Sequence, residues 1–351
     1  MARICFVGGG LDGGGMERAL TSMANYFSNN GHSVSIINLF KTDIFFKINS
    51  NIGVSWPSID RSENNRILYA IKLLPFVRKS IKSFQADVVF SYGEWYNSFV
   101  LLSTVNMKIP IYVLDRMGPN INLGFLLENA RKYLYPLANG VIVQTQTAAQ
   151  LLAPKLIKNI EIFVIPNPVN TIDGDKTAKK KQIVSCGRLS KEKGHSILLK
   201  AFAQIPHFEW TLHLIGDGPE RVNLEKEASS LGISNRVFFH GHLKKFNHLM
   251  IESQIFVLPS YYEGFPNALL EAMSVPMACI SSNCIAGPSD IIENETNGIL
   301  VEPDNITALA NQMNRLIVDD VLREFIASNA INVRERYSFE QISKLVERLI
   351  P

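Results

Sequence analysis

Arg188 and Lys193 place two positive charges directly after a predicted strand in the second half of the chain. They stand in the segment CGRLSKEKG (186–194), in which the apolar run Ile183–Cys186 predicts a strand and a glycine follows it. Open parallel sheets bind ligands at the carboxyl ends of their strands. A guanidinium and an ammonium at such a place suit an anion with spread charge, such as a diphosphate. The alternative is that both cations are simply solvated, as most Lys and Arg side chains are.

Glu263 and Glu271 are eight residues apart in the segment YYEGFPNALLEAM (261–273). The run Phe256–Leu258 predicts a strand before them, and the Pro-Asn pair at 266–267 indicates the start of a helix. One carboxylate is then on a loop and the other about one turn into the helix, so both can face the same cleft. Amides at the helix start suit a phosphate. Carboxylates near a phosphate are costly unless they bind hydroxyl groups, which a sugar and a ribose supply.

Six glycines occur among the eight residues of GGGLDGGG (8–15), between a predicted strand and a predicted helix. The segment contains a literal G-x-G-x-x-G, which is a dinucleotide fingerprint. That interpretation needs an acidic residue at the end of the second strand, about 20 positions further on. The second predicted strand, 33–40, has none, and the first acid after it is Asp43. A nicotinamide or flavin site is therefore disfavoured, whereas an anion at the helix N-terminus stays open.

His240 and His242 stand on a predicted strand and could share one of its faces. They lack nearby Cys or Asp partners, so a zinc site is disfavoured. The four cysteines have no zinc-site spacing, which favours buried free thiols in a reducing cytosol. They are Cys5, Cys186, Cys279 and Cys284.

The composition describes a globular chain without a specific charge-driven partner. The 351 residues are 46% hydrophobic and 19% charged, with a net charge of +3. This length suggests two domains, and the charge gives no indication of a nucleic-acid partner. No apolar run reaches the length of a membrane span, and the N-terminus lacks the pattern of a signal peptide.

Short apolar runs alternate with helical patterns along the whole chain, which predicts α/β architecture with doubly wound parallel sheets. The expected strands are Ile4–Val7, Val34–Leu39, Val88–Ser91, Ile111–Leu114, Val141–Gln144, Ile162–Ile165, Ile183–Cys186, Thr211–Ile215, Val237–His240, Phe256–Leu258, Met277–Ser281 and Ile299–Val301. A break after VIPNPVN (164–170) predicts two Rossmann-like domains, 1–168 and 169–335. The remaining segment, 336–351, carries a last helix that could pack on either domain.

Taken together, these motifs resemble the retaining glycosyltransferases of family 4, which have the GT-B fold. The resemblance rests on E-x7-E at 263–271 and on the G-R-L and lysine–glycine motifs before it. It extends to GGMER (14–18), IPNPV (165–169), LIGDGPER (214–221), RVFFHG (236–241) and ENETNGILVEPDN (293–305). The run GPSDIIENETNG (287–298) is similar to the branch that builds lipopolysaccharide, capsule and lipid-linked oligosaccharides. The resemblance covers nearly the whole chain.

The resemblance implies a role for each matched residue. Arg188 and Lys193 would bind the donor diphosphate and stabilise the departing nucleotide, which is a task for preorganised cations. Glu263 would hold hydroxyls of the transferred sugar, and Glu271 would hold the ribose. The family needs no obligatory metal and no further cofactor. The other implied donor-binding residues are Gly264, Phe265, Pro266 and Asn267 at the phosphates, His242 near the base, and Gly14 and Gly15 from the opposite domain.

The chain departs from the family at one position. Many relatives place a histidine near the sugar after a strand of the first domain, but here the segment is YVLDRMGPN (112–120). Asp115 and Arg116 stand at the positions where that histidine is expected. Arg116 is a weak candidate for the site, and the alternative is a charged pair that simply ends a strand.

A basic helical pattern in the first domain bears on the acceptor. The segment 63–84 combines aliphatic residues, including Ile67, with Lys72, Lys79 and Lys82. Basic amphipathic helices attract anionic lipid headgroups, although a core-packed helix with a solvated face has the same pattern. Because many family members act on polyprenyl-diphosphate-linked sugars, we expect these lysines to bind the acceptor's lipid diphosphate.

The resemblance thus implies a retaining transferase that moves an N-acetylhexosamine or hexose from a UDP-sugar. The acceptor would be a polyprenyl-diphosphate-linked or lipopolysaccharide glycan, and the enzyme would lie on an anionic membrane surface at the cytoplasmic face. Two alternatives stay open: a GDP-mannose-type enzyme of the same fold, and a nucleotide-sugar-binding protein without catalysis.

Overall fold

The computed structural model describes residues 1–59, 65–116, 118, 123–174, 177–243 and 246–351. The chain divides by its internal contacts into two compact units, which are residues 1–167 with 342–351 (unit 1) and residues 168–341 (unit 2). The boundaries expected from the sequence lie at 168/169 and 335/336. The last helix, α14 (Phe339–Glu347), crosses the second boundary between the units.

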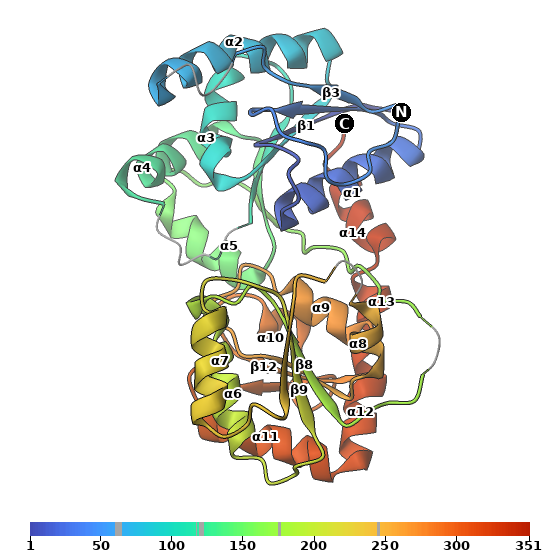
Figure 1. The fold of residues 1–351 in the computed structure, drawn as a ribbon. Coiled ribbons are helices and arrows are strands. Elements are labelled where there is room, and N and C mark those ends of the chain that lie inside the picture. Colours follow the sequence, from blue (N-terminus) through green and yellow to red (C-terminus); the bar gives the residue numbers. More distant parts are fainter. Residues whose placement is uncertain (60–64, 117, 119–122, 175–176, 244–245) are drawn as a thin grey trace. The chain divides into compact units, whose positions relative to one another are not determined.

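Unit 1 contains a seven-stranded parallel sheet in the order β3-β2-β1-β4-β5-β6-β7 (Figure 1). Its strands are β1 (Arg3–Gly8), β2 (Ser33–Asn38), β3 (Gly53–Ser55), β4 (Val88–Tyr92), β5 (Ile111–Asp115), β6 (Gly140–Val143) and β7 (Ile162–Val164). Its helices are α1 (Gly15–Asn29), α2 (Arg66–Phe84), α3 (Glu94–Ser103), α4 (Phe125–Leu134) and α5 (Gln146–Leu152), with 3₁₀ turns η1 (Tyr135–Leu137) and η2 (Ala153–Lys155).

Helices cover both faces of this sheet, which explains the continuous apolar character of its strands. In β1, Cys5 and Val7 face the core cluster that includes residues of α2, α3 and α5. Phe6 points to the opposite face, where its ring centroid lies 6.4 Å from that of Phe27 in α1. The alternation of successive side chains thus buries a strand on both sides.

Unit 2 contains a six-stranded parallel sheet in the order β10-β9-β8-β11-β12-β13. Its strands are β8 (Gln182–Cys186), β9 (Thr211–Ile215), β10 (Val237–Gly241), β11 (Ile255–Leu258), β12 (Ala278–Ser282) and β13 (Ile299–Val301). Its helices are α6 (His195–Ala203), α7 (Arg221–Ser230), α8 (Asn247–Glu252), α9 (Asn267–Met273), α10 (Pro288–Ile291), α11 (Ile306–Val318), α12 (Asp320–Ala330) and α13 (Val333–Arg336), with the 3₁₀ turn η3 (Lys191–Lys193).

The structure confirms the α/β class and the two parallel sheets expected from the sequence. Each of the twelve expected strands corresponds to an observed strand, with ends that differ by at most one residue. The analysis of the sequence missed β3, a three-residue edge strand whose residues are exposed or half-buried. A strand so short and so exposed lacks the apolar run that marks the others.

Both sheets have a switch point, where neighbouring strands lead to connections on opposite sides. In unit 1 it lies between β1 and β4, and in unit 2 between β8 and β11. Crevices at the carboxyl ends of such strands are where doubly wound sheets bind ligands. The segments that follow these four strands are therefore the ones to inspect for function.

None of the helices that the structure describes is long and apolar enough to cross a bilayer.

Three rings stack on one face of β9 and the edge strand β10. The centroid of the His213 ring lies 5.0 Å from that of Phe238 and 5.1 Å from that of His240. The Nδ1 atom of His213 is 2.9 Å from Nε2 of His240, and its Nε2 is 3.0 Å from Oγ1 of Thr211. Burial, and secondarily the neighbouring His240, lower the pKa of His213 from 6.5 to about 4.

We predict that this stack makes the stability of the protein depend on pH. The folded His213 binds its proton only near pH 4, whereas the unfolded residue binds it near pH 6.5. The stabilisation is therefore complete above pH 6.5 and is lost as the pH falls toward 4. Thermal unfolding of the wild type and of His213→Phe, measured from pH 7 to 4.5, checks this. The free energy of unfolding of the wild type should fall relative to that of the variant as the pH falls across that window. A difference that stays constant with pH would contradict the prediction.

Candidate functional site

Lys193 is held in place by the turn that follows β8. The strand ends at Cys186, and the turn η3 brings the chain back toward the segment after β11. Gly194, with φ of +66°, ends this turn, and a Cβ at that position would lie 2.1 Å from the carbonyl oxygen of Pro259. The amide of Tyr261 donates to the carbonyl of Glu192 at 2.8 Å. Only glycine permits this close approach, so the sequence Lys-Gly fixes one turn against the other.

Lys193 and Glu263 form an ion pair at the centre of these two turns. Lys193 Nζ donates to Glu263 Oε1 at 2.7 Å, and Ser260 Oγ donates to the same oxygen at 2.7 Å. Glu263 is 8% exposed. Among the described residues, nothing donates to its other oxygen, Oε2. The carboxylate is therefore positioned by one oxygen and can accept a hydroxyl of a ligand with the other.

Arg188 is exposed and lines a cavity of about 560 Å³ at the carboxyl ends of β8, β9 and β10. Its side chain makes no ion pair or hydrogen bond with the described part of the chain. An exposed guanidinium beside a cavity can meet an anion without first breaking another contact. The cavity is lined by Cys186, Gly187, Arg188, Ile215, Gly216, Asp217, Gly218, Gly241, His242, Leu243 and Phe246.

Cys186 lies near several of the predicted residues, as the charges that act on its thiol show. Burial, and after it the charge of Glu271, raise its pKa to about 12, while Lys193 acts in the opposite direction. Cys186 also lines the cavity that contains Arg188 and His242. Unit 2 therefore brings all five of the predicted charged or imidazole side chains to one edge of its sheet, as the strand order leads one to expect.

Glu271 and the residues before it occupy the first turns of the short helix α9. Asn170 Nδ2 donates to Glu271 Oε1 at 3.2 Å. Phe265 is buried, and its carbonyl accepts the Asn267 amide at 2.9 Å. Pro266 packs against Gly287: a Cβ added at Gly287 would lie 2.5 Å from Cδ of Pro266. The Asn267 N–H thus already donates to a carbonyl of the same loop, which Gly264 precedes.

His240 and His242 play different parts. His240 belongs to the stack with His213, whereas His242 lines the cavity. Within the described residues, no three His, Cys, Asp or Glu side chains gather in a way that could hold a metal ion.

The glycine segment of unit 1 owes most of its glycines to internal packing. A Cβ at Gly8 would lie 2.8 Å from Leu20, and one at Gly10 would lie 2.8 Å from Thr42. At Gly13, φ is +99° and a Cβ would lie 3.0 Å from the ring of Phe45. Side chains of the same unit fill these spaces, so the three glycines of the fingerprint have a structural explanation.

Gly14 and Gly15 differ from the other glycines. Both are exposed at the N-terminus of α1, where Gly14 is the N-cap and makes no side-chain capping bond. A Cβ at Gly15 would meet nothing within 4 Å, and one at Gly14 would meet the carboxylate of Glu17. These two predicted residues lie in unit 1, whereas the predicted residues from 188 to 271 lie in unit 2.

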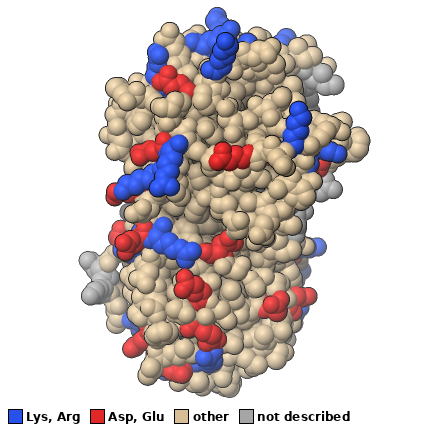
Figure 2. Space-filling view, turned by 180° about the vertical axis from the view of Figure 1, so that it is seen from behind, with Lys and Arg blue, Asp and Glu red and all other residues tan. Residues whose placement is uncertain are grey.

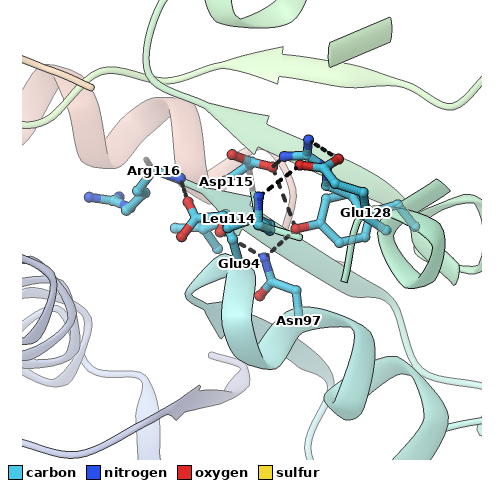
Figure 3. Close-up of polar contacts among 9 residues, drawn as sticks. Glu94, Asn97, Leu114, Asp115, Arg116 and Glu128 are labelled. Atoms are coloured by element: carbon cyan, nitrogen blue, oxygen red, sulfur yellow. Dashed lines mark hydrogen bonds and ion pairs between the residues drawn. The ribbon is translucent and has the colours of Figure 1, made fainter. Parts of the chain in front are cut away.

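A buried polar network lies where β4 and β5 of unit 1 end (Figure 3). Arg131 Nη1 is 3.3 Å from an oxygen of Asp115, and Arg131 Nη2 is 2.6 Å from Glu128. Asn97 donates to the carbonyl of Leu114 at 2.8 Å. Burial raises the pKa of Asp115, and Arg131 opposes this shift. The guanidinium thus lets the Asp115 carboxylate be buried beside a strand end, while it also pairs with the half-buried Glu128.

Arg116 lies beside this network, but its side chain turns away from it (Figure 3). Its backbone N–H donates to the carboxylate of Glu94, and its guanidinium donates to the side-chain oxygen of Asn167. The guanidinium carbon is 5.0 Å from the centroid of the Tyr92 ring. The sequence analysis missed Glu94, Asn97 and Arg131. The available signal was that Glu94 and Asn97 follow the end of β4 by only two and five positions.

Lys72, Lys79 and Lys82 are exposed on α2, as the amphipathic pattern predicts. The buried face of this helix is Tyr69, Leu73, Val77 and Ile81. The first residues of the segment, 63–64, and the side chain of Ile67 lie outside the described residues. Arg78 donates to the carbonyl oxygens of Ser103 and Val105 at the end of α3, so it is engaged in the fold itself.

Comparisons with known proteins agree with the fold and the motifs. Sequence models described as "Glycosyltransferase Family 4" and "Glycosyl transferases group 1" match residues 13–172 and 170–333. The chain is 26% identical, over 99% of its length and 97% of the relative's, to an α-1,4-N-acetyl-D-galactosaminyltransferase of Campylobacter jejuni. The full name of that enzyme gives its substrate as GalNAc-α-(1→4)-GalNAc-α-(1→3)-diNAcBac-PP-undecaprenol.

Two further relatives extend the comparison. The lipopolysaccharide 1,6-galactosyltransferase of Salmonella typhimurium is 26% identical, over 91% of this chain and 90% of the relative. The solved structure of HepE from Anabaena in complex with UDP matches with a TM-score of 0.80 at 20% identity, over 99% of this chain and 98% of that one. Since the two family models follow one another over nearly the whole length, the chain belongs to glycosyltransferase family 4, with the GT-B fold, and is a glycosyltransferase.

Proposed function

We propose that the protein is a retaining glycosyltransferase that moves a hexose or N-acetylhexosamine from a UDP-sugar to a lipid-linked or polysaccharide glycan. The observation that carries the proposal is the Lys193–Glu263 ion pair beside the cavity that Arg188 lines. Two cations and a carboxylate with one open oxygen suit a sugar joined to a diphosphate. No step in this chemistry calls for a metal, because the two cations face the charge that the departing nucleotide develops.

In this proposal each residue has one task. Arg188 and Lys193 bind the diphosphate and stabilise it as the sugar departs. Glu263 Oε2 accepts a sugar hydroxyl, and Glu271 accepts a ribose hydroxyl. The acceptor attacks the face from which the nucleotide leaves, so the anomeric configuration is retained. The remaining donor contacts in unit 2 are the backbone amides of Gly264 and Phe265, next to Pro266 and Asn267, and the side chain of His242. In unit 1, the exposed backbone of Gly14 and Gly15 offers N–H groups to an anion.

The choice of donor and acceptor follows the relatives. Two of them are named for transfer of N-acetylgalactosamine and galactose, and a third was solved with UDP. These names support a UDP-sugar and a glycan acceptor on undecaprenyl diphosphate or lipopolysaccharide. A GDP-mannose-type donor would require the same cations and carboxylates, so it is the alternative that a binding experiment must separate.

The charge of unit 1 supports an anionic membrane surface as the place of the acceptor. Residues 1–167 and 342–351 carry 18 Lys and Arg against 11 Asp and Glu, a net +7, whereas residues 168–341 carry 17 against 21, a net −4. Both signs are interspersed over the face drawn in Figure 2. On α2, Leu68 is 43% and Ile71 58% exposed, close in sequence to Lys72. Exposed aliphatic residues beside lysines favour an anionic lipid headgroup or lipid diphosphate.

We predict that Arg188→Ala and Lys193→Met each weaken UDP binding, because each removes a charge-assisted contact to the diphosphate. The loss should be about 1.5–3 kcal/mol, or roughly 10- to 100-fold in Kd. Calorimetric titration of UDP, GDP, ADP and NAD measures it. Arg315→Ala and Lys181→Ala, which break exposed ion pairs elsewhere in unit 2, are the matched controls.

Each outcome of this titration has a clear meaning. Preference for UDP, lost in the two variants and kept in the controls, supports the donor site. Preference for GDP keeps the site and moves the donor to a GDP-sugar. Binding of NAD that survives both substitutions would contradict the proposal. It would indicate that the nucleotide binds at the glycine segment, residues 8–15. Undiminished sugar transfer by Glu263→Ala would remove the role given to Glu263.

For the membrane, we predict that charge reversal of Lys72, Lys79 and Lys82 to Glu weakens binding to vesicles that contain anionic lipid. Each lysine near such a surface contributes about 1 kcal/mol, so binding should fall by roughly 100-fold or more. Vesicle sedimentation measures it. Reversal of Lys47, Lys132 and Lys158, which are exposed on other elements of unit 1, is the control with equal net charge. Equal losses in both triple variants, or no loss in either, would contradict a specific role of α2.

A further inference from the structure

The segment that carries Arg188 and the segment that carries Asp217 are joined backbone to backbone. The amide of Leu189 donates to the carbonyl of Asp217 at 3.0 Å, and the amide of Glu220 donates to the carbonyl of Leu189 at 2.9 Å. A glycine permits this approach, because a Cβ at Gly218 would lie 2.4 Å from the carbonyl oxygen of Leu189. Both Arg188 and Asp217 line the cavity. A cation and an anion thus lie on neighbouring segments of one cavity wall.

The Asp217 carboxylate is a group with which Arg188 would be expected to pair. The side chain of Asp217 is 42% exposed. The amide of Gly218 donates to its Oδ1 at 2.7 Å, and this bond, together with Arg221, holds the pKa of Asp217 below its usual range. The carboxylate is therefore ionised at neutral pH. Arg188 nevertheless makes no ion pair with any residue in the described ranges.

Arg221, the first residue of α7, occupies this carboxylate instead. Its Nη1 atom is 3.1 Å from Oδ2 of Asp217, and its Nε donates to Glu225 at 2.9 Å. Its Nη2 is 3.5 Å from the carbonyl oxygen of Phe239 in β10. The helix dipole disfavours a cation at the start of a helix, so a guanidinium at this position needs compensating partners. The three contacts supply them and hold the guanidinium beside the cavity.

A second carboxylate near Arg188 is also engaged by another donor. Glu192 accepts from Ser190 Oγ, which is the main cause of the lowered pKa of Glu192, and the charges of Lys193 and Arg188 contribute less. Both Asp217 and Glu192 are thus bound to a donor other than Arg188. This arrangement leaves the Arg188 guanidinium available to a ligand.

We propose that Arg221 is a positioning residue that acts through Asp217. By holding this carboxylate, Arg221 keeps Arg188 available to the diphosphate of the donor. The proposal rests on the proposed function, in which Arg188 meets a diphosphate. Without Arg221, the Asp217 carboxylate would pair with the guanidinium on the adjacent segment, and a ligand would have to displace it. The apparent affinity then falls in proportion to the fraction of molecules in which Arg188 is still available.

Calorimetric titration of the full chain with UDP, and with inorganic diphosphate, tests the proposal. The single variants are Arg221→Ala, Arg221→Lys, Asp217→Asn and Arg188→Ala. The double variants are Arg221→Ala/Asp217→Asn and Arg188→Ala/Arg221→Ala. Glu225→Gln is the matched control, because it changes an exposed partner of Arg221 on the same helix and leaves the contact with Asp217 in place.

We expect Arg221→Ala to weaken UDP binding by roughly fivefold, because an ion pair of exposed side chains would then hold Arg188 for most of the time. Arg221→Lys should lose less, since a lysine can still pair with Asp217. Asp217→Asn should bind UDP more tightly than the wild type, because it removes a negative charge beside the cavity. Glu225→Gln should stay within about twofold of the wild type.

The double variants separate this role from a direct one. Arg221→Ala/Asp217→Asn should recover the affinity that Arg221→Ala loses, because no carboxylate is left to pair with Arg188. Arg188→Ala/Arg221→Ala should bind UDP no more weakly than Arg188→Ala, because the guanidinium that Asp217 would capture is already absent. A guanidinium that attracts the ligand directly, or that only braces the cavity wall, would give losses that add to that of Arg188→Ala. Additive losses, or a loss that Asp217→Asn does not recover, would therefore overturn the proposal.

A crystal structure of ligand-free Arg221→Ala decides the same point without a nucleotide. Asp217 and Arg188 should lie within about 4 Å of one another in it, and an unpaired Arg188 would contradict the proposal. If the wild type bound neither UDP nor diphosphate, the proposed function would fail, whereas this structure would still decide whether Arg221 keeps Arg188 from Asp217. If Arg221→Ala does not fold, the comparison of Arg221→Lys with Arg221→Lys/Asp217→Asn takes its place, and a loss in the single variant that the second substitution does not recover overturns the proposal.

Discussion

The buried carboxylate of Glu263 depends on Lys193, and the geometry of the candidate site depends on this pair. A carboxylate that is 8% exposed is costly to keep ionised without a partner. Its pairing with Lys193 joins the turn after β8 to the turn after β11, the two strands at the switch point of the sheet. Gly194 permits the close approach of the two turns. Loss of the Lys193–Glu263 pair, or of the glycine at 194, would weaken the contact between the turn after β8 and the turn after β11.

Unit 1 also has a parallel sheet with a switch point, but different residues follow its strands. Its switch point carries the glycine segment after β1 and the buried network after β4 and β5. Four of the six glycines in residues 8–15 would place a Cβ against neighbouring side chains, whereas Gly14 and Gly15 are exposed at the start of α1. The network instead uses charged residues, with Arg131 between two carboxylates and Arg116 bonded to Asn167. The same edge of the sheet thus carries the candidate site in unit 2 and a buried polar network in unit 1.

The sequence predicted much of the fold, because parallel strands buried on both faces have a strong local signature. It also predicted that Arg188, Lys193, Glu263 and Glu271 belong to one site, since strand ends converge at one edge. The ion pair itself could not be predicted from the sequence, because Lys193 and Glu263 are 70 residues apart and only the packing of the two turns brings them into contact. The same holds for Arg116 and Asn167, 51 residues apart. The short edge strand β3 was not predicted, because three exposed or half-buried residues lack the apolar run that marks the other strands.

A crystal structure of the full chain soaked with UDP tests the central claim most directly. The account predicts that the diphosphate lies between Arg188 and Lys193, with the ribose toward Glu271 and the base in the cavity bordered by His242. A nucleotide bound instead along residues 8–15 of unit 1, with the Lys193–Glu263 pair untouched, would contradict the account and show that the glycine segment is the nucleotide site.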